Sequence, residues 1–162
     1  MNKLILGSIS AVLVLGGLVW IARPQNGAST PENSNGVLVA QEANSYDFGT
    51  ISMAAGNVTH QFRIKNTGSE AVTIRKMYTS CMCTTAFLMV QGKRFGPVGM
   101  PGHGAIPSIN QAVNPSEEAV VEVAFDPSAH GPAGVGRIQR TVTIENNSGQ
   151  PVELQFSAIV TP

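Results

Sequence analysis

The chain has 162 residues, of which 10 are basic and 10 are acidic, so its formal net charge is zero. This balance argues against nucleic acid as a partner, because neutralising several phosphates requires a clustered basic surface. Charged residues make up only 12% of the chain, and its 17 glycines and 10 prolines favour many turns over long helices. The length and composition therefore predict one globular, all-β domain after a leader.

Residues 1–23 are predicted to form a signal anchor that crosses the membrane once. The run from Leu4 to Ala22 carries no charge and lies between Lys3 and Arg23. It is about long enough to span the hydrocarbon core, and cleavage at its end would put Trp20 where signal peptidases need a small residue. The charge bias places the amino terminus in the cytoplasm and the domain outside. We expect a cell-membrane protein, or a secreted one if the leader is cleaved.

Residues 24–36 are rich in Pro, Asn, Ser, Gly and Thr, which predicts a flexible tether. Residues 37–162 instead contain short runs of alternating apolar and polar side chains, the pattern of half-buried strands. Seven to eight such runs, without a helical period, predict an immunoglobulin-like antiparallel β-sandwich. The predicted strands are 37–41, 46–51, 58–65, 71–78, 83–90, 119–125, 137–145 and 152–160.

Several features depart from this regular pattern. Residues 91–116 are rich in Gly, Pro and Asn and are predicted to form a long loop, which in a compact domain usually carries function. Lys76 and Arg140 occupy positions that alternation assigns to the core. We interpret them as a bulge or as stems that reach a sheet edge. His60 shares the parity of core residues and is interpreted as a buried histidine.

Four blocks of sequence resemble the bacterial family called domain of unknown function 1573. They are Tyr46 to Ile51, Phe62 to Gly68, Thr79 to Thr85 and Phe125 to Pro127, in the order found in the family. The resemblance implies an exported immunoglobulin-like domain, similar in architecture to major-sperm-protein and Hydin-type domains, with no established activity. Met82 departs from the family pattern, in which glycine commonly separates the two cysteines.

The two cysteines of the chain, Cys81 and Cys83, are separated by a single methionine. In an extended segment, residues two apart point to the same side, so both sulfurs can face one ligand. An antiparallel sandwich brings His130 to the same end, and the long loop can return Met100 and His103 there. Thiolates and thioethers favour Cu(I), and thiolates also favour Zn(II). These five residues therefore predict a copper or zinc site built on the cysteine pair and completed by His103, His130 or Met100.

Other roles for the cysteine pair remain open. Both can be small apolar residues that cap the core. They can also form a disulfide, which an oxidising compartment permits and which would close a small, labile ring. Thiol–disulfide exchange is a third role, although the pair lacks the two-residue spacing and the helix start that activate a thiol.

An enzyme is not expected from this sequence. It contains no nucleophile elbow, phosphate-binding glycine loop or metalloprotease helix. Its only aspartates, Asp47 and Asp126, lie at turn positions, which does not suit a hydrolytic carboxylate pair. The sequence predicts a membrane-anchored binding or scaffold module for an envelope or extracellular protein. The alternative function is copper or zinc binding in the cell envelope.

Overall fold

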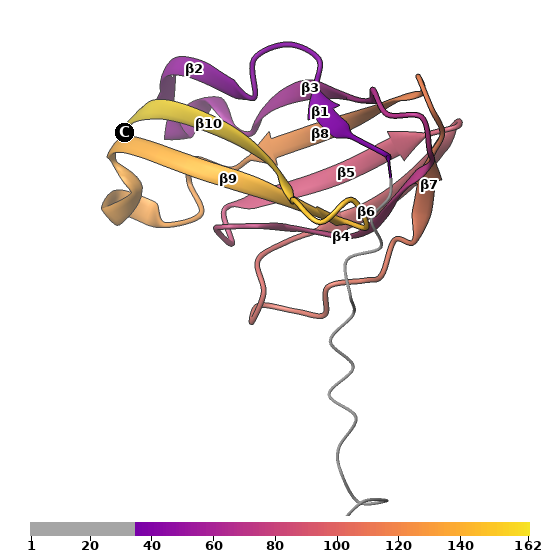
Figure 1. Ribbon diagram of the computed structural model, residues 1–162. Coiled ribbons are helices and arrows are strands. Elements are labelled where there is room, and N and C mark those ends of the chain that lie inside the picture. The colour runs from indigo at the N-terminus through magenta and orange to yellow at the C-terminus, as the bar shows by residue number, and fades with distance from the viewer. Residues whose placement is uncertain (1–34) are drawn as a thin grey trace, which may run out of the picture. The chain divides into compact units, whose positions relative to one another are not determined.

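A computed structural model describes residues 35–162, which form two five-stranded sheets (Figure 1). The strand order is β1-β3-β8-β5-β6 in the first sheet and β2-β10-β9-β4-β7 in the second. The strands are β1 Leu38–Ala40, β2 Ser45–Ser52, β3 Val58–Asn66, β4 Val72–Thr79, β5 Thr84–Val90, β6 Lys93–Val98, β7 Gln111–Val113, β8 Glu118–Phe125, β9 Gly136–Asn146 and β10 Val152–Thr161. Two short 3-10 helices, η1 Met53–Ala55 and η2 Gly131–Gly134, follow β2 and β8.

The predicted anchor, residues 1–23, lies outside the described residues, as does most of the tether. Within residues 35–162, no helix has the length and apolar character needed to cross a bilayer. The prediction of an all-β protein with two sheets is confirmed, and each of the eight predicted strands is present with small changes at its ends. Their alternating pattern was sufficient to identify them.

Residues 91–116 are not one long loop, because they contain β6 and β7. Strands β5 and β6 form a hairpin through Gln91 and Gly92, which both have positive φ angles of 53° and 71°. Two consecutive positive φ angles match the right-handed twist of a two-residue hairpin. Strand β6 lies at the edge of its sheet. Proline lacks a backbone N–H, and Pro97 is tolerated there because one side of an edge strand has no partner strand to bond. The irregular part of the segment is therefore shorter than predicted.

The sandwich is not wholly antiparallel, because β2 pairs in parallel with β10. All the other strand pairs within the described residues are antiparallel. The chain leaves the first sheet after β1 and joins the second sheet as β2, so β2 enters beside the last strand in the same direction. The alternation of apolar and polar residues shows only which face of a strand is buried. It does not show that the chain passes from one sheet to the other between β1 and β2.

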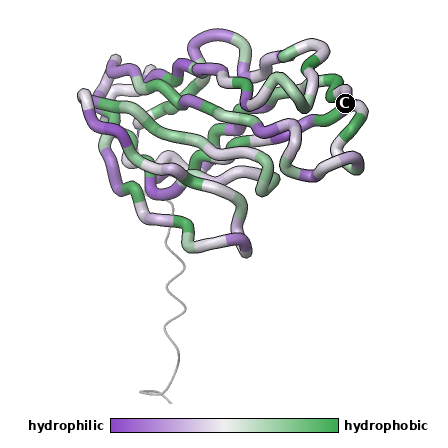
Figure 2. Tube along the Cα trace, turned by 180° about the vertical axis from the view of Figure 1, so that it is seen from behind, coloured by the Kyte–Doolittle hydropathy of each residue, from purple (hydrophilic) through white to green (hydrophobic). Residues whose placement is uncertain are grey.

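The inward faces of the two sheets form one hydrophobic core, and Figure 2 shows hydrophobic and hydrophilic residues interspersed along the strands. On β10 the buried residues alternate as predicted, with Phe156 at their centre. The break at Lys76 is a bulge, since the β4–β9 register shifts between Ile74 and Lys76, and Met77 takes the buried position. Cys81 and Cys83 belong to the same core cluster. The fold therefore places the sulfur pair where the core meets one end of the sandwich.

Candidate functional site

The two cysteines lie in a tight turn between β4 and β5, not in an extended segment as predicted. The backbone N–H of Thr84 donates to the carbonyl oxygen of Cys81 at 3.1 Å, which closes the turn. The two cysteines are joined by a disulfide. The turn therefore brings the sulfurs together, as the sequence predicted, but by chain reversal and not by strand alternation. Met82, between them, points outward and is 51% exposed.

Three hydrogen bonds from two groups hold this turn. The buried hydroxyl of Thr79 is the hydrogen-bond donor to two carbonyl oxygens. It lies 2.9 Å from that of Cys81 and 3.1 Å from that of Thr84. The backbone N–H of Asp126, at the end of β8, donates to the carbonyl oxygen of Cys83 at 2.9 Å. None of these bonds involves a sulfur atom. A fourth bond, from the backbone N–H of Cys83 to Cys81 Sγ at 3.2 Å, does involve a sulfur. The other three hold the backbone of the turn without the disulfide.

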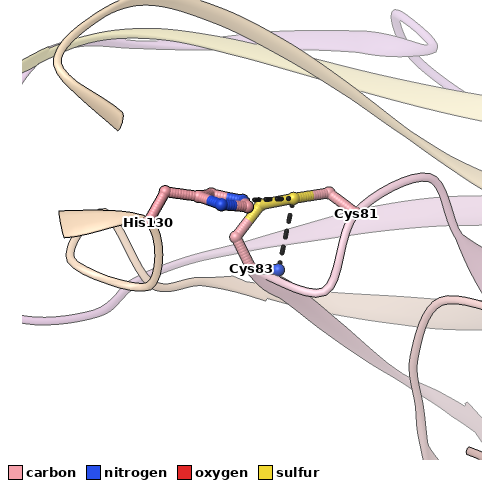
Figure 3. A group of neighbouring side chains, drawn as sticks. All are labelled: Cys81, Cys83 and His130. Carbon is pink, nitrogen blue, oxygen red and sulfur yellow. Dashed lines mark hydrogen bonds between the residues drawn. A yellow bond between two sulfur atoms is a disulfide. The ribbon is translucent and has the colours of Figure 1, made fainter. Parts of the chain in front are cut away.

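His130 is the first of two nitrogen-bearing side chains that contact the sulfurs. Its Nε2 atom lies 3.2 Å from Cys81 Sγ, and Figure 3 shows its ring directed at the disulfide. The Asp126 carboxylate accepts hydrogen bonds from the backbone N–H and the hydroxyl of Ser128, at 2.8 and 2.7 Å, and so shapes the loop that carries His130. A Cβ atom at Gly134 would lie 3.2 Å from the Cβ of His130. Glycine there leaves room for the first side-chain carbon of His130.

Arg140, on β9, is the second nitrogen-bearing side chain that contacts a sulfur atom. Its Nε–H donates to Cys83 Sγ at 3.3 Å, and its Nη1 donates to the carbonyl oxygen of Gln139 at 2.8 Å. A bulge at Arg140 is excluded, because the β9–β10 register is unbroken there. Its parity with buried Ile138 and Val142 was the signal that it faces inward. A cavity of about 340 Å³, lined in part by Arg137, Arg140 and His130, opens beside this contact.

The arrangement matches the predicted metal ligands only in part. One ligand atom each from Cys81, Cys83 and His130 lie within 4.8 Å of one another, and His103 is not part of this group. The cysteines are 7% and 3% exposed, while His130 is exposed. Met100 and His103 instead line a separate cavity with Met82. Of the predicted nitrogen ligands, His130 is therefore the one that the fold brings to the cysteine pair.

His60 is half-buried and stands apart from the sulfur atoms. Its ring stacks on Tyr46 with centroids 3.6 Å apart. Burial lowers the pKa of His60 below its ordinary value of 6.5, and the charge of Glu42 offsets part of this effect. The unfolded chain then binds a proton more readily than the folded one, so stability should fall as the pH drops through 6.5 toward the lower folded pKa.

We expect His60→Phe to reduce this pH dependence while keeping the aromatic stack. The measurement is the free energy of unfolding in denaturant at pH 7.5 and pH 5.5, with a chelator present. The wild type should lose more stability between the two pH values than the variant. Equal losses in the two proteins would show that His60 does not contribute to the acid sensitivity.

Residues 39–91 match the family model described as Protein of unknown function (DUF1573). The match confirms the resemblance seen in the sequence, and it contains β2 to β5 and the cysteine turn. It ends before His130 and Arg140, so both side chains that contact the sulfurs come from outside the DUF1573 match. No curated protein matches the chain.

Solved structures similar to this chain include a protein of unknown function from Porphyromonas gingivalis W83. It has a TM-score of 0.57 and 15% identity, over 83% of this chain and 51% of that one. The PapD-like domain 7 of human CEP192 has a TM-score of 0.45 and 13% identity, over 86% and 92%. The CooA pilin subunit from enterotoxigenic Escherichia coli has a TM-score of 0.42 and 13% identity, over 80% and 100%. The chain spans about half of the Porphyromonas protein, and that similarity shows the fold alone.

Proposed function

We propose that the chain is an extracytoplasmic, immunoglobulin-like scaffold whose working site is a redox-gated metal centre at one end of the sandwich. Residues 1–23 anchor it in the membrane, and residues 24–36 tether the domain outside the cytoplasm. When reduced, Cys81 and Cys83 bind Cu(I) or Zn(II) together with His130. The single observation that supports this function is the convergence of these three ligand atoms within 4.8 Å.

The disulfide acts as the gate. While it is closed, neither sulfur is a thiolate, so two of the three ligands are withdrawn. Reduction by a dithiol adds two electrons and two protons to the pair and oxidises the reductant to its own disulfide. Cu(I) then displaces the two thiol protons and binds two thiolates and the neutral imidazole of His130. Metal uptake at this cysteine centre is therefore possible only in the reduced form.

Arg140 balances the charge of this centre without binding the metal. One Cu(I) ion with two thiolates carries a net charge of −1, and a neutral imidazole adds none. The guanidinium of Arg140 supplies a positive charge and a donor to Cys83 Sγ at 3.3 Å. A partner of this kind orients a ligand and favours its thiolate form. The cysteines are largely buried, so the exposed His130 side is the expected entry for the ion.

The test is a Cu(I) titration of the full-length protein after reduction by a phosphine that is then removed without air. Thiolate-to-Cu(I) absorption in the ultraviolet should saturate at one ion per chain and be absent in the disulfide form. The Cys81→Ser, Cys83→Ser double variant should lose this absorption entirely. His130→Ala should weaken binding by at least about tenfold, whereas His60→Phe should match the wild type. A reduced wild type without the absorption would overturn the proposal.

A second function, thiol–disulfide exchange, is favoured by the nitrogen contact at each sulfur. The guanidinium of Arg140, which donates to Cys83 Sγ, would stabilise the thiolate that leaves from Cys83 during exchange. The cavity lined by Arg137 and Arg140 suits a partner thiol that carries negative charge. Oxidation of a model dithiol by the disulfide form, without metal, separates the two functions. Metal uptake by the reduced form with no such turnover leaves only the metal centre.

A further inference from the structure

A second cavity, of about 390 Å³, lies on the outer side of the cysteine turn. Its lining contains the side chains of Met82, Met100 and His103. These supply two thioethers and one imidazole, and no carboxylate is among the lining residues. None of the three belongs to the group formed by Cys81, Cys83 and His130. The cavity therefore gathers soft donors that the proposed metal centre does not use.

Two turns form this cavity. Met82 lies in the turn closed between Cys81 and Thr84. Met100 and His103 are the first and fourth residues of another turn, because the backbone N–H of His103 donates to the carbonyl oxygen of Met100 at 3.2 Å. Proline followed by glycine fills the middle of that turn, and Gly102 has a φ angle of +88°. This sequence is typical of a type II turn, whose outer residues approach within about 7 Å.

The backbone holds these two turns next to each other. The N–H of Thr79, just before the cysteine turn, donates to the carbonyl oxygen of Gly99 at 3.0 Å. Gly99 directly precedes Met100, so this bond brings the start of the second turn to the end of β4. Met82 and Met100 are thus placed on the same cavity by hydrogen bonds that do not depend on their side chains.

Core packing does not account for Met82. Its side chain is 51% exposed, the highest value among the exposed large hydrophobic residues of the described chain, whereas Met77 on β4 is fully buried. Met100 is half-buried and His103 is exposed. Thioether side chains are flexible, so their sulfurs can converge on an ion with little backbone movement. The exposure of Met82 leaves its sulfur available to a ligand that enters from solvent.

We propose that Met82, Met100 and His103 form a binding site for a soft monovalent cation, Cu(I). Thioether and imidazole donors select Cu(I) over hard cations, and a site without thiolate or carboxylate is poor for Zn(II). Thioethers have no proton to lose and take no part in the disulfide. Binding at this site is therefore independent of the redox state of Cys81 and Cys83, which extends the proposed function to oxidising conditions.

The test uses the full-length protein with its disulfide closed and Ag(I) as an air-stable substitute for Cu(I). The methionine methyl groups are labelled with carbon-13, and their resonances are followed by NMR during the titration. The resonances of Met82 and Met100 should shift and saturate at one Ag(I) per chain. Those of Met77 and Met89 should stay in place, and Zn(II) should shift none of them. Unmoved Met82 and Met100 resonances would overturn the proposal.

Variants distinguish this site from the cysteine centre. The Met82→Leu, Met100→Leu double variant should lose Ag(I) binding, and His103→Gln should weaken it by at least about tenfold. Met89→Leu is the matched control on β5 and should bind as the wild type does. An unchanged Met77 resonance checks that each variant is folded. If Ag(I) binding survives the double methionine change, or disappears with Cys81→Ser and Cys83→Ser, the site is elsewhere. The thiolate absorption of the reduced protein tests the first centre independently.

Discussion

Replacing Asn66 with aspartate should destabilise the domain by more than about 3 kcal/mol. Asn66 ends β3 and is fully buried. Its Nδ2 group donates to the carbonyl oxygens of Glu70 and Val113, at 2.7 and 2.9 Å. Its Oδ1 atom accepts from the backbone N–H groups of Val37 and Gly68, at 3.2 and 3.0 Å. Aspartate keeps the oxygen that accepts but replaces the Nδ2 group with a second, charged oxygen. That buried oxygen would face the carbonyl oxygens of Glu70 and Val113 and repel them.

The effect should be measured as the free energy of unfolding in denaturant. Asn57→Asp is the matched control, because it makes the same chemical change at an exposed position and should stay within about 0.5 kcal/mol of the wild type. Lowering the pH should recover part of the loss at position 66, since a protonated carboxyl regains one donor. A variant at position 66 as stable as the control would mean that the amide donors of Asn66 contribute little.

Replacing Arg140 with leucine should weaken Cu(I) binding by the reduced protein about 10- to 100-fold. Leucine keeps an apolar stem but removes the donor to Cys83 Sγ and the positive charge beside it. The remaining ligands, Cys81, Cys83 and His130, are unchanged, so the site should still fill at high Cu(I) concentration. Competition with a chromophoric Cu(I) chelator measures the change in affinity.

Arg137→Leu is the matched control for this experiment. Arg137 is on the same strand and is exposed, so the control removes the same charge from the same strand. It should reduce affinity much less than Arg140→Leu does, because no hydrogen bond from Arg137 to a sulfur is present among the described residues. Equal losses in the two variants would assign the effect to net charge and not to the contact with Cys83.

The sequence was a reliable guide to strands that have one buried face. β3 and β10 could be predicted because their side chains alternate over eight or more residues. β7 was not predicted, because it lies within the Gly-, Pro- and Asn-rich segment 91–116, and Gly96 and Pro97 interrupt the alternation in β6. The parallel pairing of β2 with β10 depends on where the chain changes sheets. Tertiary packing determines which sheet β2 joins, and the local pattern of apolar and polar residues does not record it.

The candidate site was predicted less completely. His130 was placed near the cysteines because strand ends in a sandwich alternate between its two ends, and the structure agrees. Met100 and His103 were assigned to the same centre, but the turn that carries them lines a different cavity. The contact of Arg140 with Cys83 follows from its parity with the core residues of β9, but alternation does not say which side chain it would meet. Spacing alone also could not decide whether Cys81 and Cys83 are free or joined, since that depends on the shape of the turn.

The hydroxyl of Thr79 and the backbone N–H of Asp126 clamp the cysteine turn through its carbonyl oxygens. Opening the disulfide should therefore alter the reactivity of this tip and leave its outline nearly constant. A protein that recognises the tip by shape would bind both redox forms alike. Only a molecule that bonds to sulfur would tell them apart.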